Sequence, residues 1–267
     1  MFFHLRISYD GTNYHGWQVQ PDGRTTVQGE LLHRLRLMLR NPELRIFGSS
    51  RTDSGVHALD QQVSFEADLP DDILPESLGH RLNRWLPDDI VVKSCRVCDS
   101  PFNARYDNCG KAYVYCISPG IKINPLWCRY VWRAPHELNL DAMRQAAAYL
   151  QGSHDFSSFT ANPGIEIEDK VRNLQRLEVI EKNGLVYVVA VGESFLYKMV
   201  RGLVGYLVHV GFGYASPEDA LTVLEAKDRT KAADSAPARG LFLARVFYDR
   251  DEWKEYQPPL PPFANDY

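Results

Sequence analysis

Two charged residues, Arg51 and Asp53, stand in a stretch of glycines and small hydroxyl residues at positions 47–59. Gly48 and Gly55 allow backbone angles or close approaches that a side chain would forbid. A loop of this composition, with an apolar segment on either side, can present one carboxylate in an open cleft. The alternative is a tight turn with a surface ion pair. Without further evidence, a pattern of this kind is more often such a turn.

A third charged residue, Arg201, lies in a segment that is apolar almost all round, residues 195–208. A helix of this character is buried. A buried guanidinium without a partner is very costly, so we expect a carboxylate beside Arg201. Asp53 is one candidate and Glu193 is the structural alternative. A pair with Asp53 would keep that carboxylate ionised, as a nucleophile or a base requires.

Two tyrosines follow Lys111 at alternate positions, Tyr113 and Tyr115. Because side chains alternate along a strand, this spacing places both rings on one face. By themselves these residues fit aromatic side chains of a core.

Two patterns resemble parts of metal sites. His154 and Asp155 could belong to a metal-dependent hydrolase, but no convincing set of further ligands accompanies them. Cys95 and Cys98 have half of a zinc-site spacing, but no second close pair follows. They lie in a strand-like segment, where buried thiols are common. We therefore expect no metal.

The composition is that of an ordinary soluble globular protein, with 267 residues, 45% hydrophobic and 24% charged. The net charge of −4 excludes a uniformly basic protein but not a local basic surface for phosphates. No run of about 18 apolar residues is present, so no membrane span is expected. The amino-terminal segment turns polar too early for a secretory signal, and a cytoplasmic location is expected. The odd number of cysteines, five, predicts free thiols.

The strands and helices expected around these residues indicate an α+β fold in two domains, residues 1–105 and 106–267. Apolar alternation predicts strands at 3–9, 61–67, 90–97, 111–117, 171–181, 185–192 and 241–248. Helical periodicity predicts helices at 27–38, 74–85, 140–150, 195–210 and from 216 onward. Local signals are a capping box at Thr25 and Gln28, a hairpin turn at Asn183-Gly184, and a proline-rich extended tail. The 10–18 loop is expected to expose Tyr14 and Trp17.

Residues 50–58, Ser-Arg-Thr-Asp-Ser-Gly-Val-His-Ala, resemble the signature loop of the tRNA pseudouridine synthase A family, whose catalytic aspartate aligns with Asp53. Ser50 stands where the family usually has glycine, and Ser54 where it often has alanine. Arg239 is another departure, in the carboxy-terminal motif. Further matches follow in family order at residues 9–11, 102–105, 113, 152–159, 195–201 and 236–241.

The resemblance implies conversion of uridine to pseudouridine in the anticodon stem-loop of tRNA, typically at positions 38 to 40. The reaction breaks the N1–C1′ bond, turns the uracil and rejoins it through C5, so it needs no cofactor and no metal. Asp53 is the essential carboxylate. Whether it attacks the sugar or removes a proton from it is left open.

The resemblance also implies roles for other residues. A base inside a stem must be flipped out to react. Arg51 is the candidate for occupying the vacated space, and Tyr113 for stacking on the flipped base. Arg201 would contact the catalytic aspartate, and Gly240 and Leu241 would line the uracil pocket.

The implied fold is two ferredoxin-like halves whose antiparallel sheets join across a central catalytic cleft. The implied assembly is a homodimer in which one tRNA contacts both subunits. A non-catalytic RNA-binding relative would lack the carboxylate, the tyrosine or the arginine, but Asp53, Tyr113 and Arg201 are all present. A metal-dependent hydrolase would bind metal and lose function with a chelator, and neither is expected.

Overall fold

The computed structural model describes residues 1–120, 123–162, 164 and 167–258. Contacts divide the chain into two compact units. The first comprises Met1–Cys109 and Phe242–Asp249, and the second comprises Gly110–Leu241 and the segment that starts at Arg250. Most of the proline-rich tail, residues 259–267, lies outside the described residues.

The sheet of the first unit has the strand order β4-β1-β3-β10. Its strands are β1 (Phe2–Tyr9), β3 (His57–Glu66), β4 (Ile90–Cys98) and β10 (Leu241–Phe247), and the short β2 (Phe47–Gly48) pairs with β3. β1 is antiparallel to both β3 and β4. The linear division at residue 105 placed the last strand in the second domain. Residues 242–249 pack with the first unit, where Phe242 and Leu243 pair in parallel with His57 and Ala58.

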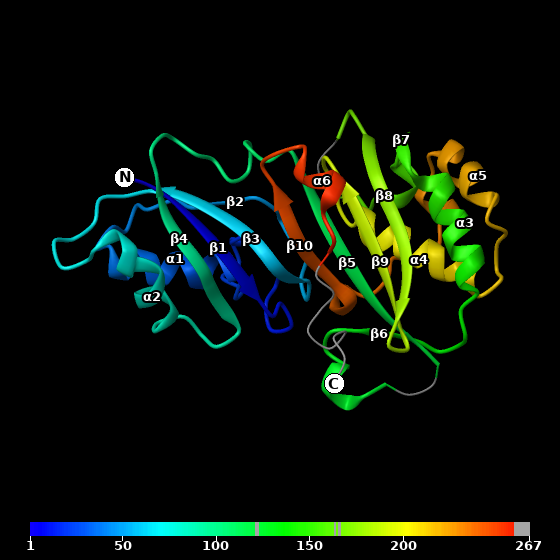
Figure 1. Ribbon diagram of the computed structural model, residues 1–267, viewed down its shortest axis with the longest axis horizontal. Helices are drawn as coiled ribbons and strands as arrows, with labels where there is room; N and C mark the ends of the chain where they lie inside the picture. The colour runs from blue at the N-terminus through cyan, green and yellow to red at the C-terminus, as the bar shows by residue number, and fades with distance from the viewer. Residues whose placement is uncertain (121–122, 163, 165–166, 259–267) are drawn as a thin grey trace. The chain divides into compact units, whose positions relative to one another are not determined.

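Two helices, α1 (Val27–Met38) and α2 (Leu78–Asn83), lie together beside this sheet (Figure 1). The predicted α1 face is buried. Its cap is one residue later than the capping box predicts, because Thr26 rather than Thr25 accepts the backbone N–H of Gly29. The predicted helix at 74–85 is shorter than expected. A 3-10 turn, η1 (Pro75–Ser77), precedes α2, and Leu74 and Trp85 are exposed.

The strands of the second unit are β5 (Gly110–Pro119), β6 (Trp132–Ala134), β7 (Gly152–Asp155), β8 (Val171–Lys182) and β9 (Leu185–Gly192). β5, β9, β8 and β7 are successive antiparallel neighbours, and β6 runs parallel to β5. The hairpin between β8 and β9 turns at Asn183 and Gly184, both with positive φ, as a type I′ turn requires. This confirms the predicted hairpin.

Figure 1 shows α3 (Leu140–Leu150), α4 (Met199–Gly211) and α5 (Asp219–Ala226) together beside β8 and β9. α4 begins four residues later than predicted, after Lys198 in the left-handed conformation. A short helix, α6 (Glu252–Glu255), was not predicted. Together the units have the α+β architecture that the sequence predicts. No helix within the described ranges is long and apolar enough to cross a membrane.

Candidate active site

Residues 49–56, here called the Asp53 loop, join β2 to β3 and have no regular structure of their own. Gln61, fully buried on β3, holds the start of this loop. Its Oε1 accepts hydrogen bonds from Ser49 Oγ at 2.7 Å and from the backbone N–H of Ser50 at 3.1 Å. Its Nε2 donates to the Ser50 carbonyl at 2.7 Å. The amide therefore fixes the backbone directly before Arg51.

Thr52, between the two charged residues, is held from two sides. Its Oγ1 and the hydroxyl of Tyr9 are hydrogen-bonded at 2.7 Å. Its carbonyl accepts the backbone N–H of Trp17 at 3.1 Å. Thr52 is buried, whereas Arg51 is exposed and Asp53 is half-buried. The loop thus keeps a buried residue between two that reach the surface.

The 10–18 loop packs directly against the Asp53 loop, and two glycines permit this approach. A Cβ on Gly11 would lie 1.9 Å from the carbonyl oxygen of Val56. A Cβ on Gly16 would lie 2.7 Å from the carbonyl oxygen of Thr52, and the φ of Gly16 is +89°. Neither contact tolerates a side chain without movement of backbone.

The two aromatic residues of the 10–18 loop are buried, which corrects the prediction that they are exposed. Tyr14 is 5% exposed and Trp17 is 1% exposed. The Tyr14 carbonyl accepts from Gly55 N and from Ser54 Oγ, and the Tyr14 hydroxyl donates to Asp89 Oδ1. Burial, and next the bond to Asp89, raise the pKa of Tyr14 well above its usual value, so the hydroxyl remains a donor.

His57 fixes the end of the Asp53 loop. Its Nδ1 lies 3.1 Å from the backbone nitrogen of Gly11 and 3.1 Å from Asp10 Oδ1. Its buried ring stacks on Phe242 with centroids 4.8 Å apart. Within the loop, the Asp53 carbonyl accepts the N–H of Val56 at 3.1 Å. The backbone that carries Asp53 is therefore anchored before, within and after the loop.

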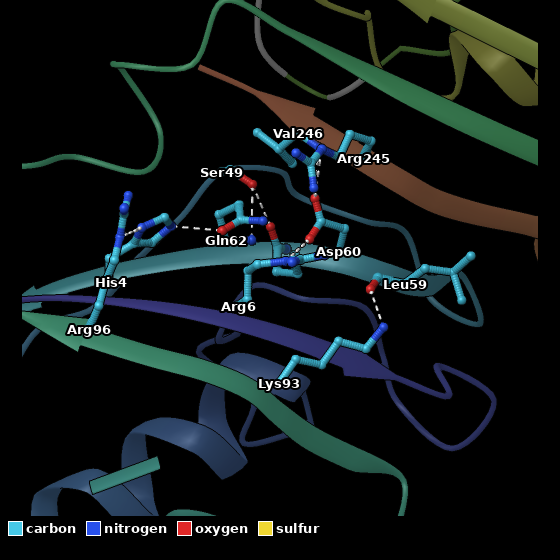
Figure 2. A network of polar contacts seen from close by, with 11 residues as sticks. His4, Arg6, Ser49, Leu59, Asp60, Gln62, Lys93, Arg96, Arg245 and Val246 are labelled. Carbon is cyan, nitrogen blue, oxygen red and sulfur yellow. Dashed lines mark hydrogen bonds and ion pairs between the residues drawn. The ribbon is translucent and has the colours of Figure 1, made fainter. Parts of the chain in front are cut away.

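A polar network lies on the same sheet, seen in Figure 2, and centres on the buried carboxylate of Asp60. Arg6 Nε lies 2.6 Å from Asp60 Oδ1. The backbone N–H of Val246 donates to Asp60 Oδ2 at 3.1 Å, and Arg245 Nε lies 4.0 Å from the same oxygen. Asp60 therefore ties β1, β3 and β10 together. Asp60 is close to Asp53 in the sequence, but its role is structural.

His4 belongs to the same network (Figure 2). Arg96 Nε donates to His4 Nδ1 at 2.9 Å, so the ring proton sits on Nε2 and is donated to Gln62 Oε1 at 2.7 Å. Burial, and next the charge of Arg96, lower the pKa of His4 to about 4. His4 is therefore neutral at physiological pH.

The other predicted site residues, Tyr113, Arg201, Gly240 and Leu241, belong to the second unit. Arg201 is half-buried, which corrects the expectation of a fully buried guanidinium. Its Nε donates to the Ala236 carbonyl at 2.7 Å, and the Ala236 N–H donates to the Arg201 carbonyl at 2.9 Å. Arg201 thus joins α4 to residues 236–240, here called the 236–240 segment.

Gly240 lies against the ring of Tyr115, where a Cβ would be 2.6 Å from a ring carbon. The Tyr115 hydroxyl donates to the Pro237 carbonyl at 2.6 Å. Tyr115 is therefore a core residue that supports the 236–240 segment, as the simpler interpretation of the sequence allows. Tyr113 is also mostly buried and meets the ring of Phe195 edge-on, with centroids 5.0 Å apart. Leu241 is buried.

A family model described as tRNA pseudouridine synthase matches residues 6–107 and 146–249, which is well over half of the chain. The matched ranges include the Asp53 loop, its supports Gln61 and Tyr9, and Arg201. The chain belongs to the tRNA pseudouridine synthase family.

Curated relatives agree with this assignment. The tRNA pseudouridine synthase A of Fervidobacterium nodosum is 43% identical, with 91% of this chain and 98% of that protein covered. The tRNA pseudouridine synthase A of Geobacillus kaustophilus is 41% identical, with coverages of 91% and 93%. The tRNA pseudouridine synthase A 2 of Clostridium tetani is 38% identical, with coverages of 92% and 98%.

Among solved structures, a Cbf5-Nop10-Gar1 complex is similar at a TM-score of 0.37 and 14% identity, with 91% of this chain and 58% of that chain covered. A likeness at this level adds nothing to the family assignment. The α+β fold of the two units is that of the pseudouridine synthase family. The arrangement of two halves around a central cleft stays a prediction.

His154 and Asp155 make hydrogen bonds within their own segment. His154 Nε2 donates to the Gln151 carbonyl, and Asp155 Oδ1 accepts from Ser157 N and Oγ. Burial raises the pKa of Cys95 to about 11, which disfavours a thiolate ligand. No group of three or more His, Cys, Asp or Glu suited to a metal occurs in the part of the chain that is described.

Sequence reasoning missed the supports of the Asp53 loop, above all Gln61 and Tyr9. One signal was present. Gln61 and Gln62 are consecutive amides in an otherwise apolar strand, and buried polar side chains require hydrogen-bond partners. The sequence alone does not say that the partner of Gln61 is the backbone of residue 50.

Proposed function

We propose that this protein isomerises uridine to pseudouridine in the anticodon stem-loop of tRNA, typically at positions 38 to 40, with Asp53 as the essential carboxylate. The reaction and the RNA substrate are those of the family to which the chain belongs. The observation behind the proposed role of Asp53 is the anchored loop. Contacts from Gln61, Tyr9 and His57 fix a segment that has no regular structure, and this segment exposes Arg51 beside Asp53.

The chemistry needs one ionised carboxylate held in a constant position. The N1–C1′ bond breaks, a bond between C5 and C1′ forms, C5 loses its proton and N1 gains one, so the product is an isomer of the substrate. A carboxylate can serve either by attack on the sugar or by removal of a sugar proton. A loop with a fixed backbone supplies the preorganisation that both routes require.

The other roles follow the same proposal. Arg51, exposed on the Asp53 loop, fills the space that the flipped base leaves in the stem. Tyr113 stacks on the flipped uracil, Arg201 contacts Asp53, and Gly240 and Leu241 line the uracil pocket. The protein acts in the cytoplasm, where tRNA is modified. It acts as a homodimer in which one tRNA contacts both subunits, and light scattering with and without tRNA tests this assembly.

Site-by-site mapping of pseudouridine in unmodified tRNA transcripts, incubated with the protein alone, tests the function. We expect pseudouridine in the anticodon arm with the wild-type protein. Asp53→Asn keeps the shape of the side chain but removes its charge, so we expect turnover to disappear while tRNA binding and the melting temperature stay close to wild type. Turnover by Asp53→Asn would remove Asp53 from the mechanism. Wild-type protein that binds tRNA but forms no pseudouridine would favour a non-catalytic RNA-binding relative.

A further inference from the structure

A surface hollow of about 440 Å³ lies in the first unit, where the end of α1, residues 72–73 and the end of α2 meet. Its walls include three arginines, Arg40, Arg81 and Arg84, together with Leu37 and Trp85. The Asp53 loop contributes none of the lining residues. The hollow is therefore separate from the site described above.

The charge of this hollow is predominantly positive. Asp72 is the carboxylate in its lining, and two arginines share it: Arg40 Nη2 lies 3.4 Å from Oδ1 and Arg81 Nη1 lies 3.9 Å from Oδ2. Arg81 also donates to the backbone carbonyl of Asp72 at 2.7 Å, which holds its guanidinium at the wall. Arg84 is exposed. Three guanidinium groups facing one carboxylate leave an excess of positive charge, which suits a polyanion.

The hollow also exposes apolar surface beside the arginines. Trp85 is 51% exposed and Leu37 is 55% exposed. The sequence predicted Trp85 on the buried face of a helix, but α2 ends at Asn83, so the indole is on the surface. Guanidinium groups bind phosphates in a bidentate manner, and aromatic rings stack on unpaired bases. A nucleotide offers both features in one group.

α1 connects this hollow to the Asp53 loop. At its first residue, the N–H of Val27 donates to the Gly16 carbonyl, and Gly16 packs on Thr52 of the loop. At its other end, Leu37 and Met38 line the hollow. A helix of 12 residues is ~18 Å long at 1.5 Å per residue.

We propose that this hollow binds a nucleotide of the substrate tRNA away from the uridine that reacts. Arg40, Arg81 and Arg84 contact its phosphate, and Trp85 packs on its base. The proposal rests on the proposed function, because that function supplies the RNA. Contacts of this kind add affinity and fix the register of the RNA on the protein, and they take no part in the chemical step.

Titration of full-length tRNA at several salt concentrations tests the proposal, with single-turnover pseudouridine formation at saturating tRNA as the second readout. Arg84→Ala and Arg40→Gly each remove one guanidinium. Arg40 has a φ of +53°, which glycine adopts readily, so Arg40→Gly does not strain the fold. We expect each variant to weaken binding several-fold and to reduce the salt slope by about one. The rate at saturation should not change.

Two further variants sharpen the test. Trp85→Ala should weaken binding about five-fold or more, whereas Trp85→Phe should retain most of the affinity because it keeps a ring. Asp72→Asn removes the opposing charge and should tighten binding. Lys254→Ala is the matched control, because Lys254 is an exposed cation whose Nζ lies 3.0 Å from an exposed carboxylate, that of Asp251, in the second unit. We expect its affinity to equal that of the wild type.

Wild-type affinity and salt slope in Arg84→Ala, Arg40→Gly and Trp85→Ala would overturn the proposal and would indicate a different occupant, such as an acidic protein segment. Failure of the proposed function gives a different result. In that case the wild-type protein forms no pseudouridine, whatever the variants do to tRNA affinity. The two failures are therefore distinguishable in one set of measurements.

Discussion

The Asp53 loop and the 236–240 segment are both irregular stretches with predicted site residues, but different contacts hold them. Side chains from a buried strand bind the backbone of the Asp53 loop, as Gln61 does at Ser50. The 236–240 segment is held by the Arg201–Ala236 pair and by close packing of Gly240 on Tyr115. The first arrangement fixes the backbone while Arg51 stays exposed and Asp53 half-buried, which suits the proposed contact of these two residues with RNA. The second brings a backbone segment against the core.

If side chains of β3 hold the Asp53 loop, replacing Gln61 should have the largest effect on stability and turnover. Gln61→Leu leaves the buried N–H and carbonyl of Ser50 without their amide partner, which should lower the free energy of unfolding by roughly 2–5 kcal/mol. A displaced loop should also lower kcat on the order of 100-fold. Chemical denaturation and single-turnover assays measure the two effects.

Gln62→Leu is the matched control for this prediction. Gln62 Oε1 accepts from His4, whereas Gln62 bonds to Ser49 of the Asp53 loop through its backbone, which the substitution keeps. Its loss should therefore affect stability but spare the rate at saturating tRNA. Equal rate losses in the two variants would mean that Gln61 does not act through the loop.

Gly11→Ala tests the glycine contact that belongs to the first arrangement. Its Cβ would meet the Val56 carbonyl at 1.9 Å, so backbone must move. We expect a stability loss of roughly 1–3 kcal/mol together with a reduced kcat. Gly23→Ala adds a methyl group where no atom lies within 4 Å and should leave turnover unchanged. Unaltered kcat in Gly11→Ala would show that the 10–18 loop does not position Asp53.

Arg201→Ala tests the second arrangement. It removes a charged donor from the Ala236 carbonyl, so we expect the free energy of unfolding to fall by about 2 kcal/mol. Because Arg201 is half-buried, water can replace part of the lost bond, and this loss should be smaller than that of Gln61→Leu. Melting temperatures measured by calorimetry check whether Arg201→Ala is less destabilising than Gln61→Leu. A melting temperature equal to that of the wild type would show that the pair contributes nothing.

The smallest expected effect concerns His4, which stabilises the sheet rather than either irregular stretch. Its pKa is lowered from 6.5 to about 4 in the folded protein, so the unfolded chain binds more protons between these values. Stability from this group is present above pH 6.5 and is lost as the pH falls toward 4. We expect a loss of about 1 kcal/mol between pH 7 and pH 5.5.

His4→Gln removes this titration and should flatten the pH dependence of unfolding in the same window. The charged groups around the ring are Arg96, Arg6 and Asp60, and all three are kept in His4→Gln. An identical pH dependence in wild type and His4→Gln would assign the effect to other residues.

Local patterns predicted much of the secondary structure. The helix at 140–150 and the hairpin at Asn183-Gly184 depend on neighbours within a few residues, so their periodicity and turn chemistry are visible in the sequence. The predictions that were wrong depend on distant contacts. Trp85 follows the apolar spacing of a helix that ends before it. Tyr14 and Trp17 are buried where the Tyr14 hydroxyl bonds to Asp89 and the Trp17 ring packs on Gly48, both far away in sequence.

The sequence by itself determined which residues could perform chemistry, because the pattern around Arg51 and Asp53 is short and contiguous. It also determined the α+β class through the alternation of its strands and the periodicity of its helices. Only the tertiary structure decided what holds Asp53, because Gln61, Tyr9 and Gly11 act through contacts that spacing does not encode. It likewise decided that the strand at 241–247 pairs with β3, since strand pairing depends on backbone hydrogen bonds between segments far apart in the chain.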